Sequence, residues 1–386
     1  MRVTIVGAGI IGLSLAWELS RRGASVRVIE RGAAGRETSW AAAGILPAAR
    51  CDTATDPLER LRGLSHELYP SWVNSLEAIS GIDSGLRRCG GLYLASSIGE
   101  AASLVANVDY QRDLKIDATL LTRDQLATDE PALADWANSI RFRAAVLSND
   151  EWQIRPPDLL AALLTACRAS GVHIDEFTEA ELRIHDAHAT VQMLGSNIPG
   201  TLAESDFVVV CGGAWAGHGA SQVGLANSII PVRGQMLLYN FSTPQLRRIV
   251  NEGHRYLVPR ADGRLLVGSC EEEVGFQKGT TAEVLEPLIR WAESVLPALV
   301  GMRPEKSWSA LRPGTIDGFP MIGRVPNVAN LYLAAGHYRS GIHLAPATAM
   351  AIADMIFGQP PAVDLAAFDV GRMVQASAFN PEYTKT

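Results

Sequence analysis

The first part of the chain carries glycines and an acidic residue spaced as in sites that bind a dinucleotide. Gly7, Gly9 and Gly12 form a G-x-G-x-x-G pattern, and Glu30 follows at the ~20-residue spacing typical of such sites. In this pattern the first glycine allows a tight turn, the second lets the backbone approach a pyrophosphate, and the third brings a helix close to a strand. A carboxylate at Glu30 can accept hydrogen bonds from ribose hydroxyl groups and would repel a 2′-phosphate. The residues therefore favour FAD or NAD over NADP.

These residues need a strand–helix–strand unit to position them, and the surrounding sequence predicts one. Residues 3–6 are apolar and predict a strand, the turn 7–12 leads into a helix that ends at Arg22, and a second strand ends at Glu30. The free N–H groups at the helix start would then face the phosphates. A glycine-rich turn in an ordinary α/β core is the alternative interpretation of the same residues.

The composition limits the class of protein. A chain of 386 residues predicts about two or three domains. Hydrophobic residues make up 47% and charged residues 19%, which is enough for a large core and gives no sign of disorder. The net charge of −7 comes without a long run of one sign, so we expect neither a nucleic-acid-binding nor a polybasic membrane surface.

The five cysteines are odd in number and scattered, with no C-x-x-C motif. A disulfide framework and a structural metal site are therefore not expected, and a reducing cytoplasm fits the pattern. The apolar start carries Glu18 and lacks a basic segment beyond Arg2, so we expect no signal peptide. We also find no uninterrupted apolar stretch of the ~20 residues that a membrane span requires.

Further elements are predicted along the chain. The small residues from Thr38 to Gly44 suit a backbone that lies against a flat ligand. Asp56 and Pro57 are typical of a helix start, and apolar spacing extends that helix to about Ile79. Further helices are expected over 156–171, 281–296 and 346–357. Strands are expected over 92–95, 172–177, 182–193, 207–211, 230–239, 255–260, 264–269 and 330–335. The strands typical of a nucleotide fold are thus split among three regions, which predicts one α/β domain interrupted by a second domain.

A series of motifs then follows in a specific order: GAGIIG with Glu30, TSWAAAG, VVVCGGAWA, PVRGQ, YLVPRADGRLLVG, LRPGTIDGFPMIGR and AAGHYRSGIHLAPATA. Over nearly the whole chain they resemble the FAD-dependent D-amino acid oxidase superfamily, and within it the glycine oxidases of thiamine biosynthesis. The C-terminal motifs are much more specific than the glycine triplet, because a plain NAD dehydrogenase has no counterpart to them. The resemblance implies non-covalent FAD and oxidation of the Cα–N bond of a small amino acid.

The resemblance also implies a fold: an α/β class protein of the p-hydroxybenzoate hydroxylase type, with an α+β second domain. A Rossmann-like FAD-binding domain is then interleaved with a substrate domain built on an antiparallel sheet. We expect residues 1–84, 151–225 and 315–386 to form the FAD-binding domain. Residues 85–150 and 226–314 would form the substrate-binding domain.

In this family, residues from three of the motifs line the substrate site, and they correspond here to Tyr256, Arg312 and Arg339. We assign Arg312 to the substrate carboxylate, because a guanidinium fork makes two parallel charge-assisted bonds. Tyr256 can add a hydrogen bond to that carboxylate. Arg339 either anchors the ligand or shapes the flavin loop. His337 is interpreted as a packing or flavin-edge residue rather than as a base.

The resemblance implies flavin contacts for a longer set of residues. They are Gly7, Gly9, Ile10, Ile11, Gly12, Glu30, Thr38, Ser39, Ala43, Gly44, Ala180, His337, Tyr338, Arg339, Ser340, Gly341 and Ile342. The match around Ala180 is the weakest of these. Backbone N–H groups of Gly341 and Ile342 would stabilise the negative charge that develops on the flavin N1–C2=O edge.

Three departures or absences qualify the resemblance. Ser340 precedes Gly341 where the family often has asparagine, which backbone contacts would tolerate. Glu271 occupies a position where relatives often place an apolar side chain near the substrate; it either faces the pocket or is a solvated strand end in an acidic run. Residues 307–323 contain no cysteine, which disfavours the covalent flavin of the related sarcosine oxidases.

The expected reaction is transfer of a hydride from a neutral small amino acid to FAD, which is followed by reoxidation by O2 to hydrogen peroxide. The imino acid would hydrolyse or pass to a thiazole-forming partner, and the family commonly forms homo-oligomers. A dehydrogenase of the same fold that reduces a quinone or a partner subunit is one alternative. A flavin-binding protein without turnover is another, although the presence of Arg312 and Tyr256 argues against it. The sequence does not rank glycine, sarcosine, D-alanine and D-proline as substrates.

Overall fold

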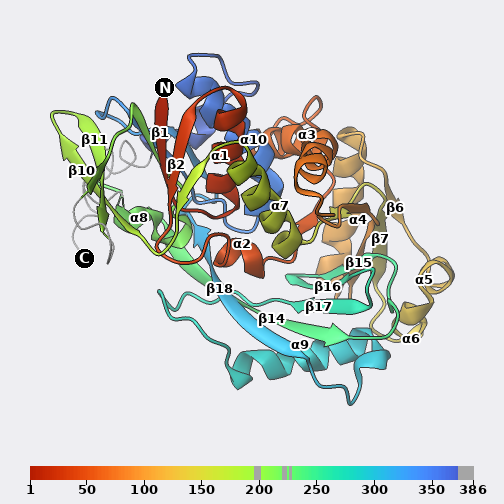
Figure 1. The fold of residues 1–386 in the computed structure, drawn as a ribbon. Coiled ribbons are helices and arrows are strands. Elements are labelled where there is room, and N and C mark those ends of the chain that lie inside the picture. The colour runs from red at the N-terminus through yellow and green to blue at the C-terminus, as the bar shows by residue number, and fades with distance from the viewer. Residues whose placement is uncertain (195–200, 220–223, 226–227, 373–386) are drawn as a thin grey trace, which may run out of the picture.

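The computed structural model describes residues 1–194, 201–219, 224–225 and 228–372, which fold around two large sheets (Figure 1). The first sheet has six strands in the order β19-β20-β13-β1-β2-β9. All neighbours are parallel except β19 and β20. The strand bounds are Arg2–Val6 (β1), Ser25–Ile29 (β2), His173–Asp175 (β9), Phe207–Val210 (β13), Met321–Arg324 (β19) and Leu331–Ala335 (β20).

Both faces of this sheet are covered. Residue Val209 packs with the helices, whereas its neighbours Val208 and Val210 pack with the small antiparallel sheet on the other face. Burial on both faces explains why β13 is a continuous apolar run rather than an alternating one. The helices are α1 (Ile10–Arg21), α3 (Pro57–Ser80), α7 (Pro156–Ala169) and α10 (Gly341–Ile356). The small sheet consists of β10 (Glu179–His185), β11 (His188–Leu194) and β12 (Thr201–Ala203).

The second large sheet has eight strands in the order β18-β14-β17-β16-β15-β5-β7-β6. It is antiparallel except for the parallel pair β5 and β15. The bounds are Gly91–Ala95 (β5), Ala118–Leu120 (β6), Ala144–Ser148 (β7), Ile230–Asn240 (β14), Ile249–Glu252 (β15), Arg255–Pro259 (β16), Arg264–Gly268 (β17) and Lys306–Gly314 (β18).

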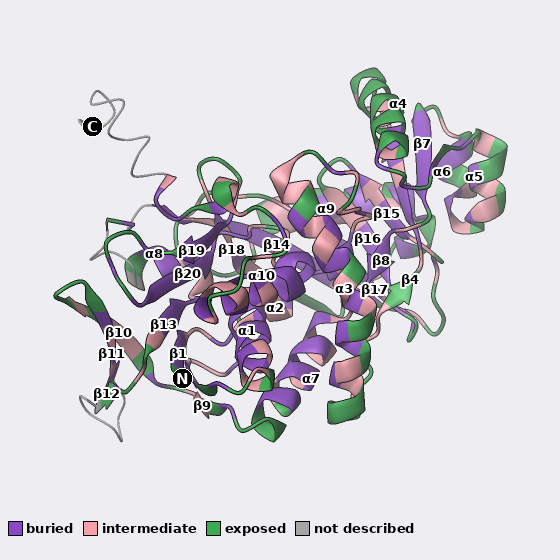
Figure 2. Ribbon diagram, turned by 90° about the horizontal axis from the view of Figure 1, so that it is seen from above, coloured by how far each residue is buried: buried purple, intermediate pink, exposed green. Residues whose placement is uncertain are grey.

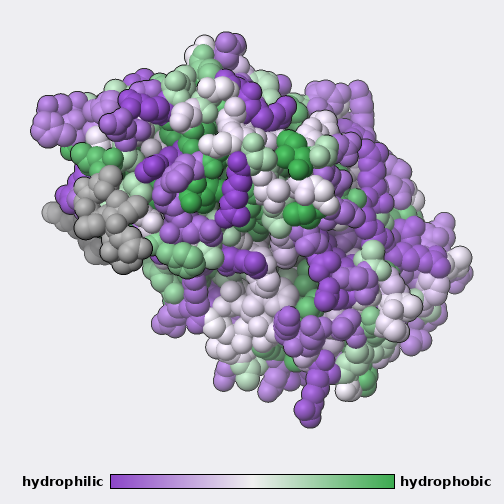
Figure 3. Space-filling view, in the orientation of Figure 1, coloured by the Kyte–Doolittle hydropathy of each residue, from purple (hydrophilic) through white to green (hydrophobic). Residues whose placement is uncertain are grey.

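One face of this sheet packs against α9 (Ala282–Val295), α5 (Arg123–Asp129) and α6 (Ala134–Asn138). Helix α4 (Ile98–Asp113) lies at the periphery and is largely exposed (Figure 2). A small sheet of β3 (Ile45–Leu46), β8 (Trp152–Gln153) and β4 (Arg87–Arg88) lies near the opposite face. Short helices α2 (Thr38–Ala41) and α8 (Ala216–Gly219) complete the arrangement. The face of the molecule drawn in Figure 3 carries hydrophilic residues interspersed with small hydrophobic patches.

Several predicted elements agree with the structure. Helix α3 begins at Pro57, and the Asp56 side chain caps it by accepting a hydrogen bond from the Glu59 backbone N–H at 2.9 Å. The mixed α/β arrangement is that of the predicted fold class. The predicted domain bounds stay a prediction, and residues 195–200, 220–223, 226–227 and 373–386 within them lie outside the described residues.

Two predicted elements are wrong in detail. The single strand expected over 182–193 is a hairpin of β10 and β11, because Asp186 and Ala187 both adopt a positive φ, of 48° and 58°, and turn the chain. The last helix begins at Gly341 instead of at Pro346. Pro346 therefore lies inside α10, where its missing N–H leaves a carbonyl without its helical donor.

Hydroxyl groups of α3 satisfy the backbone of α10 where Pro346 interrupts it. The Tyr69 hydroxyl donates to the Ile342 carbonyl, which is the acceptor that Pro346 cannot serve. The Ser65 hydroxyl donates to the His343 carbonyl at 2.5 Å and accepts from the Ala347 N–H at 3.3 Å. These contacts from a neighbouring helix allow α10 to extend by one turn toward the site.

Candidate active site

A cavity of about 570 Å³ opens at the carboxyl ends of β1, β2 and β13. Glu30 lines it at the end of β2, where its carboxylate accepts hydrogen bonds from the backbone N–H groups of Ala8 at 2.8 Å and Gly32 at 3.0 Å. Gly9 precedes α1 and offers no side-chain cap, and the Ile10 N–H donates to the Ser39 hydroxyl at 3.0 Å. The helix start, the acid and the glycine turn therefore meet in one cavity that suits a dinucleotide.

Two glycines of the motif are required by close packing. Gly7 has a φ of +107°, and a Cβ there would lie 2.5 Å from the Cys211 carbonyl oxygen. A Cβ at Gly12 would collide with the Gly7 carbonyl. Gly12 lies against the turn and lines neither this cavity nor the second one described below, which matches a packing role for the third glycine.

The far end of the first cavity contains residues that the sequence did not single out as ligand contacts. Trp215 lines this end, and the Arg31 guanidinium lies 3.8 Å from its ring centroid. Lys278 lies 5.1 Å from the same ring centroid and pairs with Glu37 at 2.7 Å. This end of the cavity therefore combines a flat aromatic side chain with nearby positive charge. Ala180, whose match to the family is weak, also lines this cavity, and its flavin contact stays a prediction.

A second cavity of about 480 Å³ adjoins the first. The residues that line both cavities include Thr38, His337, Tyr338, Arg339 and Ile342. Of the predicted cofactor residues, the first cavity is lined by Gly7, Gly9, Ile10, Ile11, Glu30, Thr38, Ser39, Ala180, His337, Tyr338, Arg339, Gly341 and Ile342. The second is lined by Ala43, Gly44 and Ser340 in addition to shared residues. An elongated ligand can therefore extend from one cavity into the other.

Tyr256, Arg312 and Arg339, the three predicted substrate residues, all line the second cavity. Tyr256 belongs to a row of side chains across the eight-stranded sheet, in which strand pairing aligns it with Asn251 on one side and Gly268 on the other. Its hydroxyl lies 3.2 Å from the Met236 sulfur, toward which it donates. A Cβ at Gly268 would collide with the Tyr256 ring, so only a glycine here leaves enough space for that ring.

Arg312 is held in the cavity by the segment that follows β17. Its Nη1 donates to the Cys270 carbonyl at 2.9 Å, and its Nη2 donates to the Ser269 hydroxyl at 2.6 Å. Gly234 on β14 leaves room for the guanidinium, because a Cβ there would collide with it. The glycine of the PVRGQ motif thus makes room for the arginine of the LRPGT motif on the adjacent strand.

Glu271, for which the sequence left a pocket-facing and a solvated position open, is exposed and lines neither cavity, but it contacts two residues that do. Its carboxylate pairs with Arg339 Nη2 at 2.6 Å and accepts a hydrogen bond from the Tyr338 hydroxyl. Partial burial raises the pKa of Glu271, but the Tyr338 hydrogen bond and the charges of Arg339 and Arg312 outweigh it and bring the pKa below its usual value. Glu271 is therefore a solvent-exposed residue that pairs with the loop carrying Arg339.

His337 is buried at the junction of the cavities and its Nε2 lies 3.1 Å from the Thr348 hydroxyl inside α10. Burial lowers its pKa to about 3, so the imidazole is neutral and only weakly basic. This environment supports a packing role over a role as general base. Thr38 is equally engaged in structure, because its hydroxyl donates to the Leu311 carbonyl at 2.6 Å and joins α2 to β18.

The second cavity also contains polar residues that sequence reasoning missed: Arg62, Tyr93, Asn251 and His254. Arg62 reaches it from α3 and donates to the Ser340 hydroxyl at 3.2 Å. Burial lowers the pKa of His254. The one sequence signal was a charged residue within the apolar pattern of α3. Tyr93 and Asn251 lie on strands that only tertiary pairing brings together, and His254 lies in the turn between β15 and β16.

Comparison with known proteins decides the family. Residues 2–355 match the model of the FAD dependent oxidoreductase family. The chain belongs to this family. A glycine oxidase of Pseudomonas aeruginosa is 34% identical over 95% of this chain and 98% of its own. The crystal structure of glycine oxidase from Geobacillus kaustophilus superimposes with a TM-score of 0.89 at 32% identity, covering 96% of this chain and 99% of that one.

The protein is thus an FAD-dependent amino acid oxidoreductase with the fold of that family, as the sequence motifs predicted. A further relative is the Bifunctional protein ThiO/ThiG of Synechocystis, which is 32% identical over 96% of this chain and 54% of its own length. Within the described residues, no helix combines the length and hydropathy needed to cross a bilayer. In the same part of the chain, no group of three His, Cys, Asp or Glu residues could hold a metal ion.

Proposed function

We propose that the protein oxidises glycine or another small neutral amino acid at its Cα–N bond. The observation that carries the proposal is that Arg312, Tyr256 and Arg339 converge in a cavity that continues into the dinucleotide cavity. This arrangement supports a carboxylate-binding role for Arg312 beside the region that suits the flavin ring. The three arise from β16, β18 and the loop before α10, so only the folded chain brings them together.

The residues that line the first cavity have the chemistry to hold FAD. Glu30 would accept the ribose hydroxyls, the start of α1 would face the pyrophosphate, and Trp215 offers a stacking surface at the far end. Gly341 and Ile342 begin α10 at the junction of the cavities, where a helix start favours negative charge. Cys211 lines the first cavity, but burial raises its pKa to about 12, so its thiol stays protonated. This supports the prediction of a non-covalent cofactor.

Arg312 would bind the substrate carboxylate through its planar fork, since its bonds to Ser269 and Cys270 fix the orientation of the guanidinium. Tyr256 would donate a hydrogen bond to the same carboxylate in place of its contact with Met236. Arg339 is already paired with Glu271, which supports its role in shaping the flavin loop. When bound, FAD supplies the acceptor for the substrate hydride, so the protein needs only to bind, orient and deprotonate the substrate.

Three finer features belong to the same proposal. Reoxidation by O2 to hydrogen peroxide would make the protein an oxidase, in keeping with the names of the relatives that it matches. The fused ThiO/ThiG relative supports delivery of the imino acid product to a thiazole-forming partner in thiamine biosynthesis. A homo-oligomeric state remains a prediction from the family resemblance.

A screen of small amino acids tests the proposal. Purified holoenzyme is mixed anaerobically with glycine, sarcosine, D-alanine or D-proline while the yellow flavin band is followed, and air is then admitted. Bleaching followed by rapid reoxidation with peroxide release is expected. Bleaching with sluggish reoxidation in air would instead favour the dehydrogenase alternative, and no bleaching by any of these compounds would favour a non-catalytic flavoprotein.

A further inference from the structure

Glu151 is a fully buried carboxyl group directly behind the wall of the second cavity. One carboxylate oxygen accepts a hydrogen bond from the Tyr93 hydroxyl, and the other accepts one from Asn251 Nδ2 at 3.2 Å. Tyr93 and Asn251 line the cavity. Gly91 leaves room for the carboxylate, because a Cβ there would collide with it. Glu151 therefore connects to the cavity through two side chains that face the substrate space.

Strand pairing holds this arrangement in register with the substrate residues. The parallel pair β5 and β15 sets Tyr93 opposite Asn251, and the antiparallel pair β15 and β16 sets Asn251 opposite Tyr256. Residues that are aligned across neighbouring strands share one face of a sheet. The three polar side chains therefore form a continuous row from Tyr256 toward Glu151.

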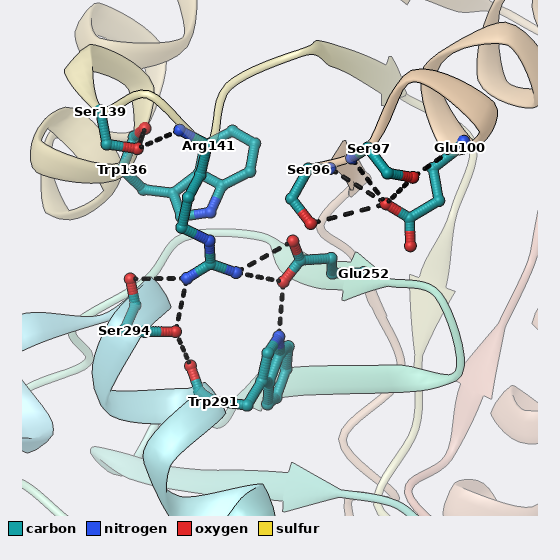
Figure 4. A network of polar contacts seen from close by, with 9 residues as sticks. All are labelled: Ser96, Ser97, Glu100, Trp136, Ser139, Arg141, Glu252, Trp291 and Ser294. Atoms are coloured by element: carbon teal, nitrogen blue, oxygen red, sulfur yellow. Dashed lines mark hydrogen bonds and ion pairs between the residues drawn. The ribbon is translucent and has the colours of Figure 1, made fainter.

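The opposite face of β15 is held by a separate network (Figure 4). Glu252 follows Asn251 and points to the other side of the sheet, where both of its oxygens lie 3.1 Å from Arg141 Nη2. Trp291 of α9 donates its indole N–H to the same carboxylate. These bonds fix the strand, and with it the orientation of Asn251 toward the cavity.

Glu151 is poised to change charge near neutral pH. Burial raises its pKa to about 7, in spite of the hydrogen bonds that it accepts. The neighbouring groups differ: burial raises the pKa values of Tyr93 and of the Cys89 thiol, and it lowers that of His254 across the cavity. Arg62 of α3 is the nearby cation and favours the ionised form of Tyr93. Glu151 is thus suited to hold a proton temporarily.

We propose that Glu151 receives, through Tyr93, the proton that the substrate ammonium group must lose before oxidation. The inference rests on the proposed function, in which a neutral amine donates the hydride. An N–H bond of the ammonium breaks and its proton passes to the Tyr93 oxygen, while the Tyr93 hydroxyl proton moves to the Glu151 carboxylate. An ammonium and a carboxylate become an amine and a carboxyl group, and no electrons are transferred. Glu151 acts through Tyr93 and is therefore a positioning residue.

Two variants of the holoenzyme test this route. Glu151→Gln keeps the size of the side chain and one of its two acceptor oxygens but cannot take up the proton. Tyr93→Phe leaves the carboxyl group and its bond from Asn251 in place and removes the hydroxyl that would relay the proton. Glu130→Gln is the matched control, because Glu130 is another buried carboxylate of this sheet region and binds the Arg247 N–H away from both cavities.

The rate of anaerobic flavin bleaching by glycine is measured from about pH 6 to about pH 9. In the unaltered protein and in the Glu130→Gln control, the rate should rise with an inflection near the pKa of about 7. Both test variants should lose about 100-fold in rate at about pH 8, and the inflection should disappear. Infrared spectroscopy gives a second readout: a carboxyl band that titrates near neutral pH in the unaltered protein and in Tyr93→Phe, and is lost in Glu151→Gln.

An inflection that persists in either variant would overturn the assignment while leaving the proposed function intact. If Glu151→Gln does not fold, Tyr93→Phe and the infrared titration decide the matter, and an unchanged profile in Tyr93→Phe refutes the route. Failure of the unaltered protein to be bleached by any small amino acid would refute the proposed function itself, and the proton assignment with it.

Discussion

The buried carboxyl of Glu151 should make the stability of the protein depend on pH. Its pKa rises from an ordinary value of 4.5 to about 7 in the folded state because the side chain is fully buried. The folded protein therefore binds more protons than the unfolded chain between these two values, so stability falls as pH rises through this window. The difference between the folded and the unfolded pKa corresponds to roughly 3 kcal/mol in the free energy of unfolding. Glu151→Gln removes this penalty at high pH.

Urea unfolding of the holoenzyme and of Glu151→Gln at about pH 5 and about pH 8 measures the effect. From the lower to the higher pH, the free energy of unfolding of the unaltered protein should fall by roughly 3 kcal/mol more than that of the variant. Glu273→Gln, which removes an exposed carboxyl group in the acidic run, serves as the control and should show no such difference. An equal pH dependence in Glu151→Gln and the unaltered protein would show that the carboxyl does not titrate in this window.

Three other substitutions have defined outcomes. Arg312→Ala should raise the apparent KM for glycine by about 100-fold or more while FAD remains bound, measured by steady-state kinetics and flavin absorbance; an unchanged KM would remove Arg312 from the site. Glu271→Gln should release Arg339 and raise kcat/KM for a dicarboxylic amino acid relative to glycine by about fivefold, and an unchanged ratio would contradict that pairing. Tyr69→Phe should lower the free energy of unfolding by about 1–3 kcal/mol, because the Ile342 carbonyl loses its donor; thermal unfolding that matches the unaltered protein would argue against this contact.

Much of the cofactor end of the molecule was predictable because its signals are local. The strand, the glycine turn, the helix and Glu30 occupy one short segment, and each residue type follows from backbone geometry or from charge. The continuous apolar run of β13 likewise indicated a strand that is buried on both faces. The convergence of Arg312 and Tyr256 came from the family motifs, because nothing in residue spacing relates β18 to β16.

The missed features depend on contacts between distant parts of the chain. Tyr93 and Asn251 meet only because β5 pairs in parallel with β15, a pairing that alternation in either strand does not specify. The early start of α10 was missed because proline usually marks a first helical position, whereas hydroxyls of α3 satisfy the backbone around Pro346. The turn at Asp186 and Ala187 lies within an alternating pattern that continues on both sides of it.

A crystal structure of the FAD-bound protein with glycolate would test the proposed site most directly, since glycolate carries the substrate carboxylate but no amine. We expect the isoalloxazine ring at the junction of the two cavities, beside the start of α10, and the glycolate carboxylate on the Arg312 guanidinium next to Tyr256. Glycolate bound elsewhere, or an Arg312 side chain turned away from the flavin, would contradict the proposed function.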